Sequence, residues 1–187
     1  MTKKQLSDMS LEELWQLFPI FLTKHQEDWK IWFLEEEQLL KSTLSQVERI
    51  NHVGSTAINS IWAKPIIDIL VEVPNGSNLP YYRGLVENNG YICMSQSADR
   101  ISFNKGYTED GFAERVFHLH LRYYGDNDEL YFRDYLNEHS DVASEYEKMK
   151  LKLWKEYEYN RDGYTNAKTE FVKKHTEKAR MLYGNRY

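Results

Sequence analysis

The stretch that most constrains the fold is residues 51–73, with the sequence NHVGSTAINSIWAKPIIDILVEV. Its second half is an apolar run over 66–71 that is interrupted by a single carboxylate, Asp68. A charged group is costly to bury unless its neighbours compensate the charge. Asp68 therefore lies either at an exposed strand edge or in a site where a carboxylate has a use. In the second case the Gly54-Ser55 turn would be a small phosphate-binding turn that faces it.

The composition indicates a globular domain without a membrane span. The chain has 187 residues, of which 41% are hydrophobic and 28% charged, as in soluble proteins. Its apolar runs are too short to cross a bilayer, and its first residues lack the apolar core of a secretory signal. The formal net charge of −5 argues against a general nucleic-acid surface. A single cysteine, Cys93, excludes an internal disulfide and fits a reducing compartment, so we expect a cytoplasmic protein.

Periodicity and turn residues predict an α+β core. Strands are predicted at 46–52, 65–73, 91–95, 100–105 and 115–124. Helices or helical turns are predicted at 11–18, 26–44, 56–61 and 79–88, the first opened by a capping box of Ser10 and Glu13. The glycine-bounded segment 106–111 is expected to be a loop. This order predicts a small mixed or antiparallel sheet with flanking helices.

The chain after Gly125 shows helical patterns only, at about 127–139, 140–159 and 165–183. We expect a core with N-terminal helices over 1–125 and a C-terminal three-helix segment over 126–187. The segment would pack on the core, and the two parts could form one continuous domain. Apolar and aromatic residues at helical spacing in the middle helix, such as Tyr146 and Leu153, predict core packing.

Five segments, in order along the chain, resemble the GrpB family. They are HVGSTAI at 52–58, AKPIIDILVEV at 63–73, FHLHL at 117–121, FRDYLNEHSDVASEYEKMK at 132–150 and YTNAKTEFV at 164–172. That family is assigned to the nucleotidyltransferase superfamily, typified by DNA polymerase β and kanamycin nucleotidyltransferase. The resemblance implies a minimal nucleotidyltransferase sheet followed by a helical bundle, and it implies no particular substrate.

The superfamily pattern is a Gly-Ser turn followed by an acid–apolar–acid sequence on a strand that holds a divalent cation. Gly54 would let the backbone approach a phosphate, and Ser55 could donate to it. Asp68 matches the first acid, but the second falls at Leu70. Alternate strand residues share a face about 6.6 Å apart, so Glu72 is roughly 13 Å away from Asp68. The two-carboxylate clamp is therefore incomplete.

Two histidines offer a replacement for the missing acid. His118 and His120 are two residues apart on a predicted strand, so both imidazoles point to one face. With Asp68 they would make a divalent metal site, nearer to the preference of zinc, manganese or iron than of magnesium. They could instead form a hydrogen-bonded pair on a partly solvated face, or act as general base or phosphate donor.

Several cations are candidates for a phosphate ligand. Lys64 precedes the second strand, and Arg133 and Lys168 lie in the segments that resemble the family. Arg100 and Lys105 flank another predicted strand. The alternative for each of them is a solvated side chain or a surface ion pair.

The predicted function is a metal-dependent nucleotidyltransferase that acts on a small molecule and uses a nucleoside triphosphate. Asp68, His118 and His120 would be the catalytic and metal-binding residues, with Mg, Mn or Zn left open. One alternative, favoured by Leu70, is a non-catalytic nucleotide- or phosphate-binding module. Another is a different metal-dependent phosphate chemistry on the same Asp-His-His face. The expected partner is a small-molecule or nucleotide ligand, not bulk nucleic acid or a membrane.

Overall fold

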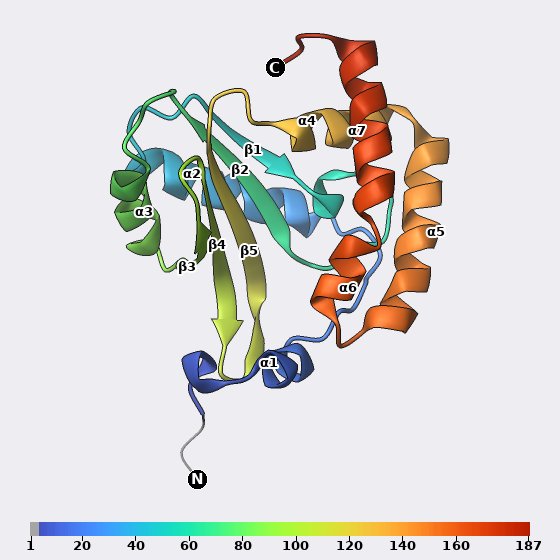
Figure 1. The fold of residues 1–187 in the computed structure, drawn as a ribbon, viewed down its shortest axis with the longest axis horizontal. Coiled ribbons are helices and arrows are strands. Elements are labelled where there is room, and N and C mark those ends of the chain that lie inside the picture. Colours follow the sequence, from blue (N-terminus) through green and yellow to red (C-terminus); the bar gives the residue numbers. More distant parts are fainter. Residues whose placement is uncertain (1–3) are drawn as a thin grey trace.

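The computed structural model describes residues 4–187, and Figure 1 shows a single twisted sheet with helices packed around it. A short 3-10 helix, η1 (Leu6–Asp8), precedes α1 (Leu11–Leu17) and α2 (Asp28–Thr43). The predicted capping box is confirmed at the start of α1. Glu13 N donates to Ser10 Oγ, and Ser10 N donates to the Glu13 carboxylate at 2.7 Å.

The sheet has five strands in the order β1-β2-β5-β4-β3. They are β1 (Arg49–Val53), β2 (Ile67–Val73), β3 (Ile92–Gln96), β4 (Arg100–Thr108) and β5 (Gly111–Tyr123). The pair β2 and β5 is parallel, and the other neighbouring pairs are antiparallel. A 3-10 turn, η2 (Ser55–Ala57), and α3 (Leu79–Glu87) lie between strands. The predicted α+β fold with a mixed sheet is therefore confirmed.

The strand β2 lies between β1 and β5, so Asp68 does not lie at a sheet edge. Because side chains alternate along a strand, the two faces of β2 pack against different helices. Ile67 and Ile69 are buried in the main core with Trp29 of α2. Leu70, which shares the face of Asp68, is buried in a separate cluster with Leu130. The edge alternative for Asp68 is therefore wrong.

The expectation of a loop at 106–111 is wrong, because β4 and β5 continue through it as a tight hairpin. The register shifts between Lys105 and Tyr107, which marks a bulge around Gly106. Gly106 has φ +90°, and a Cβ there would lie 2.3 Å from the Arg115 carbonyl oxygen. The bulge therefore needs a glycine, and that glycine is what made the sequence read as a loop.

The C-terminal helices are α4 (Asp128–Glu138), α5 (Ser140–Tyr157), α6 (Arg161–Asn166) and α7 (Thr169–Tyr183). The predicted third helix at 165–183 therefore covers parts of two elements. The first of them, α6, begins before residue 165, where the Asn160 side chain caps it by accepting from Gly163 N at 2.8 Å. Figure 1 shows α4, α5 and α7 gathered at one side of the sheet, and they share a buried cluster with Ile58. The boundary near Gly125 stays a prediction. No helix within 4–187 is long and apolar enough to cross a bilayer.

Candidate functional site

A cleft of about 710 Å³ lies between the sheet and the C-terminal helices. It gathers side chains from the turn after β1, from β2 and β5, and from α4 to α7. Six residues that were predicted from the sequence line it: Gly54, Ser55, Lys64, Asp68, His118 and Lys168. Residues over a hundred positions apart therefore meet in one space.

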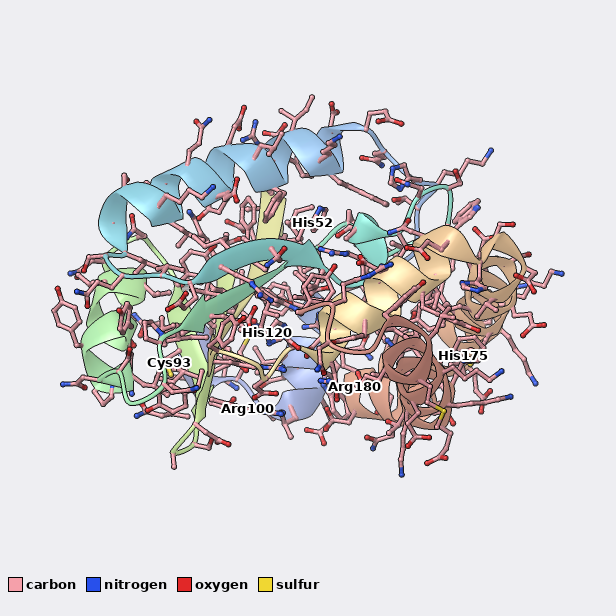
Figure 2. The ribbon with its side chains drawn as sticks, turned by 90° about the horizontal axis from the view of Figure 1, so that it is seen from above. His52, Cys93, Arg100, His120, His175 and Arg180 are labelled. Atoms are coloured by element: carbon pink, nitrogen blue, oxygen red, sulfur yellow. The ribbon has the colours of Figure 1, made fainter. Side chains whose placement is uncertain are left out.

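The carboxylate of Asp68 lies beside both predicted histidines. Asp68 and His118 are opposite each other in the parallel pairing of β2 and β5. Asp68 Oδ1 lies 3.2 Å from His118 Nδ1 and 3.9 Å from His120 Nε2. His120 lies near the middle of the sheet in Figure 2 and is not among the cleft-lining residues. The structure thus brings the three side chains together, with only Asp68 and His118 on the cleft itself.

A chain of hydrogen bonds orients the His118 ring. Arg161 Nη2 donates to Tyr107 Oη at 2.9 Å, and Tyr107 Oη lies 2.8 Å from His118 Nε2. Burial raises the pKa of the Tyr107 phenol and lowers the pKa of His118, so both groups are neutral near pH 7. The Tyr107 hydroxyl therefore donates a hydrogen bond to His118 Nε2, and His118 Nδ1–H points to Asp68 as the donor on the other side. Arg161 and Tyr107 thereby fix one tautomer of His118.

The Asp68 carboxylate is ionised in this setting. Burial works to raise its pKa, but the nearby imidazoles of His118, at 3.2 Å, and His120, at 3.9 Å, outweigh that effect and hold the pKa below its usual value. On its other side Gly54 has φ +72° and ψ −172°, a conformation that is essentially reserved for glycine. A Cβ at Gly54 would lie 2.1 Å from Asp68 Oδ2. The glycine of the turn is therefore required by its contact with Asp68.

The second acid of the nucleotidyltransferase pattern is missing in space as well as in sequence. Leu70 is completely buried and packs with Leu130 of α4. Glu72 is also completely buried, and its Oε1 accepts from Gly125 N at 2.9 Å and Asn127 Nδ2 at 3.0 Å. Glu72 thus anchors the β5–α4 connection. Asn127 is occupied there and does not cap α4 with its side chain.

The metal site stays a prediction. Within residues 4–187, no group of three or more His, Cys, Asp or Glu side chains is arranged to hold a metal ion. Both ring nitrogens of His118 are engaged, one with Asp68 and one with Tyr107. A metal on His118 would have to displace one of these partners, because a metal ligand uses the nitrogen lone pair.

Three lysines line the same cleft as Asp68. The ammonium groups of Lys64 and Lys168 lie 5.3 and 4.3 Å from the centroid of the Tyr164 ring. Lys150 is only 1% exposed and donates to the Trp62 carbonyl oxygen. In the described part of the chain none of the three lysines forms an ion pair with a carboxylate. The cluster therefore holds three lysines outside ion-pair distance of any described carboxylate, although Asp68 attracts Lys64 and Lys168, and Glu147 attracts Lys150.

The lysines lose affinity for their protons in this environment. Burial, with repulsion from neighbouring cations, lowers the pKa of Lys64 to about 7 and that of Lys150 to about 7. Burial lowers the pKa of Lys168 to about 8, opposed by attraction to Asp68. A bound anion would favour the charged form of all three.

The other predicted cations lie outside the cleft. Arg133 does not line it, because its guanidinium donates to the His52 carbonyl oxygen at 2.9 Å and to Tyr187 Oη at 3.0 Å. It thereby ties α4 to β1 and to the C-terminus. Arg100 pairs with Asp126, and Lys105 pairs with Glu36. The surface-pair alternative holds for Arg100, while Lys105 bridges β4 to α2.

Sequence reasoning missed Tyr107 and Arg161 altogether. Tyr107 fell in the segment that was expected to be a loop, and Arg161 in the gap between two predicted helices. Tyr146, which lines the cleft, was assigned to core packing from its helical spacing. Only knowledge that β4 continues past Gly106 would have placed Tyr107 beside His118.

Comparisons with known proteins agree with the fold and the motifs. The family model for GrpB protein matches residues 19–178. Glutamate-rich protein GrpB of Alkalihalophilus pseudofirmus is 36% identical over 159 residues, which are 82% of this chain and 91% of that protein. The crystal structure of conserved protein GrpB from Enterococcus faecalis matches with a TM-score of 0.76 at 30% identity, covering 87% of this chain and 99% of that chain.

A weaker likeness extends to Cid1 poly(U) polymerase with Mg 3'-dATP bound. The TM-score is 0.49 at 12% identity, covering 84% of this chain and 51% of that chain. A score at this level establishes neither a shared activity nor a shared ligand. The family match over most of the chain is decisive, and the protein belongs to the GrpB family.

Proposed function

We propose that the cleft binds a phosphorylated small molecule, with a nucleotide as the first candidate, through Lys64, Lys150 and Lys168. The observation that carries this proposal is the cluster of three lysines in one cleft, each outside ion-pair distance of a carboxylate within the described residues. Holding cations together in a partly buried space is unfavourable, and a multiply charged phosphate relieves it. Lysine ammonium groups bind phosphate through charge-assisted hydrogen bonds.

The Asp68–His118 pair in the same cleft gives the ligand an orientation. The Asp68 carboxylate repels phosphates, so they lie toward the lysines. The rest of the ligand then faces the Asp68–His118 pair. A neutral His118 held in one tautomer is suited to accept or relay a proton there, once its Nε2 exchanges Tyr107 for a ligand group.

A second candidate function is metal-dependent nucleotidyl transfer to a small molecule. The observation that favours it is the convergence of His118 and His120 on Asp68, at 3.2 and 3.9 Å. Leu70 weighs against it, because the position of the second clamp acid is buried and apolar. If this candidate holds, Asp68→Ala abolishes binding of Mn²⁺ and nucleotide binding requires a divalent ion.

Calorimetric titration with ATP at pH 7, in EDTA and then in Mg²⁺, separates the two candidates. The lysine proposal predicts saturable binding in EDTA that Lys168→Gln weakens about tenfold or more, because one charge-assisted contact is lost. Lys152→Gln is the matched control, since it removes the same charge from an exposed position on α5. Binding that appears only with a divalent ion favours the second candidate. No binding under either condition removes both.

A further inference from the structure

A smaller pocket of about 220 Å³ adjoins the cleft at its Lys64 end. Two residues, Lys64 and Ile66, line both spaces. The remaining lining is apolar apart from Glu114, and consists of Pro19, Phe21, Pro65, Phe112, Ala113 and Val116. The charged cleft and the mostly apolar pocket are thus neighbours, and the Lys64 side chain borders both of them.

Backbone hydrogen bonds hold the wall of this pocket in place. Thr23 and Ala63 form a bridge with N–H···O distances of 2.9 and 3.0 Å, and Ile20 N donates to the Glu158 carbonyl oxygen at 2.8 Å. The rings of Phe21 and Phe112 meet edge to face at 6.1 Å. The segment before α2 is therefore fixed on two sides, and the pocket is part of the fold.

The charges of the two spaces set the direction of a ligand. The Lys64 ammonium lies over the ring of Tyr164, which lines the larger cleft. Glu114 is exposed, and its carboxylate disfavours a phosphate inside the smaller pocket. A phosphate therefore lies on the cleft side of Lys64, and an uncharged group on the pocket side.

We propose that the natural ligand carries one compact apolar group, an aromatic ring or a branched hydrocarbon, bonded close to its phosphate, and that this group occupies the smaller pocket. This inference rests on the proposed function, from which it keeps the phosphate and the lysines. It departs from the nucleotide as first candidate, because a nucleotide carries a sugar between its phosphate and its base. The volume is below the roughly 300 Å³ at which pockets begin to enclose a whole drug-sized molecule, so it accommodates one group. Burial of such a group strengthens binding by removing apolar surface from water.

Phenyl phosphate and methyl phosphate test this directly, because they carry the same charge and differ only in the apolar group. NMR titration of the full chain should show phenyl phosphate binding about tenfold or more tighter than methyl phosphate. Ala113→Trp places a large ring at the exposed mouth of the pocket and should remove this gain while leaving methyl phosphate affinity unchanged. Ala113→Ser is the matched control and should keep the gain.

Equal affinity for the two esters overturns the inference, and so does a gain that survives in Ala113→Trp. Either result leaves the proposed function standing, provided that methyl phosphate binds and Lys64→Gln weakens it. If ATP binds in EDTA but neither ester binds, this inference alone fails. If ATP does not bind either, the proposed function fails and this inference fails with it. Thermal unfolding of Ala113→Trp shows whether the variant is folded, and an aromatic residue suits a strand position.

Discussion

The lysine cluster makes a quantitative prediction about pH. Lys64 and Lys150 have pKa values lowered to about 7, and the pKa of Lys168 is lowered to about 8. Each lysine must be protonated to attract an anion, so affinity is highest below pH 7 and falls as the pH rises through 7 and 8. Inorganic sulfate is a suitable probe because it stays a dianion over this range.

The size of the effect follows from the same values. A lysine with a pKa of about 7 that is held charged in the complex lowers the affinity about tenfold between pH 6 and pH 8. For Lys168, with a pKa of about 8, the loss is about twofold. If the three lysines titrate independently, these losses multiply to a fall in affinity of roughly two hundredfold between pH 6 and pH 8. This value is an upper limit, because it requires that their titrations are uncoupled.

The assay is sulfate titration at pH 6, 7 and 8 at constant ionic strength, since charge interactions are screened by salt. Lys64→Gln should make the loss of affinity between pH 6 and pH 8 about tenfold smaller. Lys152→Gln should leave that loss unchanged. Affinity that is flat between pH 6 and pH 8, or that rises with pH, would refute the idea that buried lysines bind the anion.

Two further predictions concern the Asp68–His118 pair. Gly54→Ala should lower the free energy of unfolding, measured in urea, by about 1–3 kcal/mol more than Gly76→Ala does. Both glycines have positive φ, but only Gly54 contacts Asp68. Equal losses in the two variants would show that the contact is unimportant. Tyr107→Phe removes the donor to His118 Nε2 and should raise the pKa of His118 in an NMR titration, because that hydrogen bond favours the neutral ring. The exposed Tyr81→Phe serves as its control, and an unchanged or lowered His118 pKa would contradict the tautomer assignment.

The parts of the fold that sequence could predict are those governed by local pattern. The apolar run before Val73 and the alternation around His118 both became strands, because side-chain periodicity decides which face is buried. The capping box at Ser10 could also be predicted, because its two partners are only three residues apart in the sequence. The shared face of Asp68 and His118 followed once the two strands paired in parallel register.

The parts that sequence could not predict depend on contacts between distant elements. Gly106 looked like a strand breaker, although the bulge it allows keeps Tyr107 in the sheet. Arg133 resembled a phosphate ligand, yet its guanidinium is used to join α4 to β1. Lys150 comes close to Lys64 only because α5 packs against the segment before β2, where Lys150 donates to the Trp62 carbonyl oxygen, and no local spacing encodes that contact.

The location of a bound phosphate tests the central claim most directly. A crystal structure of the protein grown with ATP in EDTA would show where the phosphates lie. The proposal predicts phosphate oxygens within hydrogen-bond distance of the Nζ atoms of Lys64 and Lys168, beside the ring of Tyr164. Phosphates bound away from these lysines, or bound only when a divalent ion sits on Asp68, would contradict it.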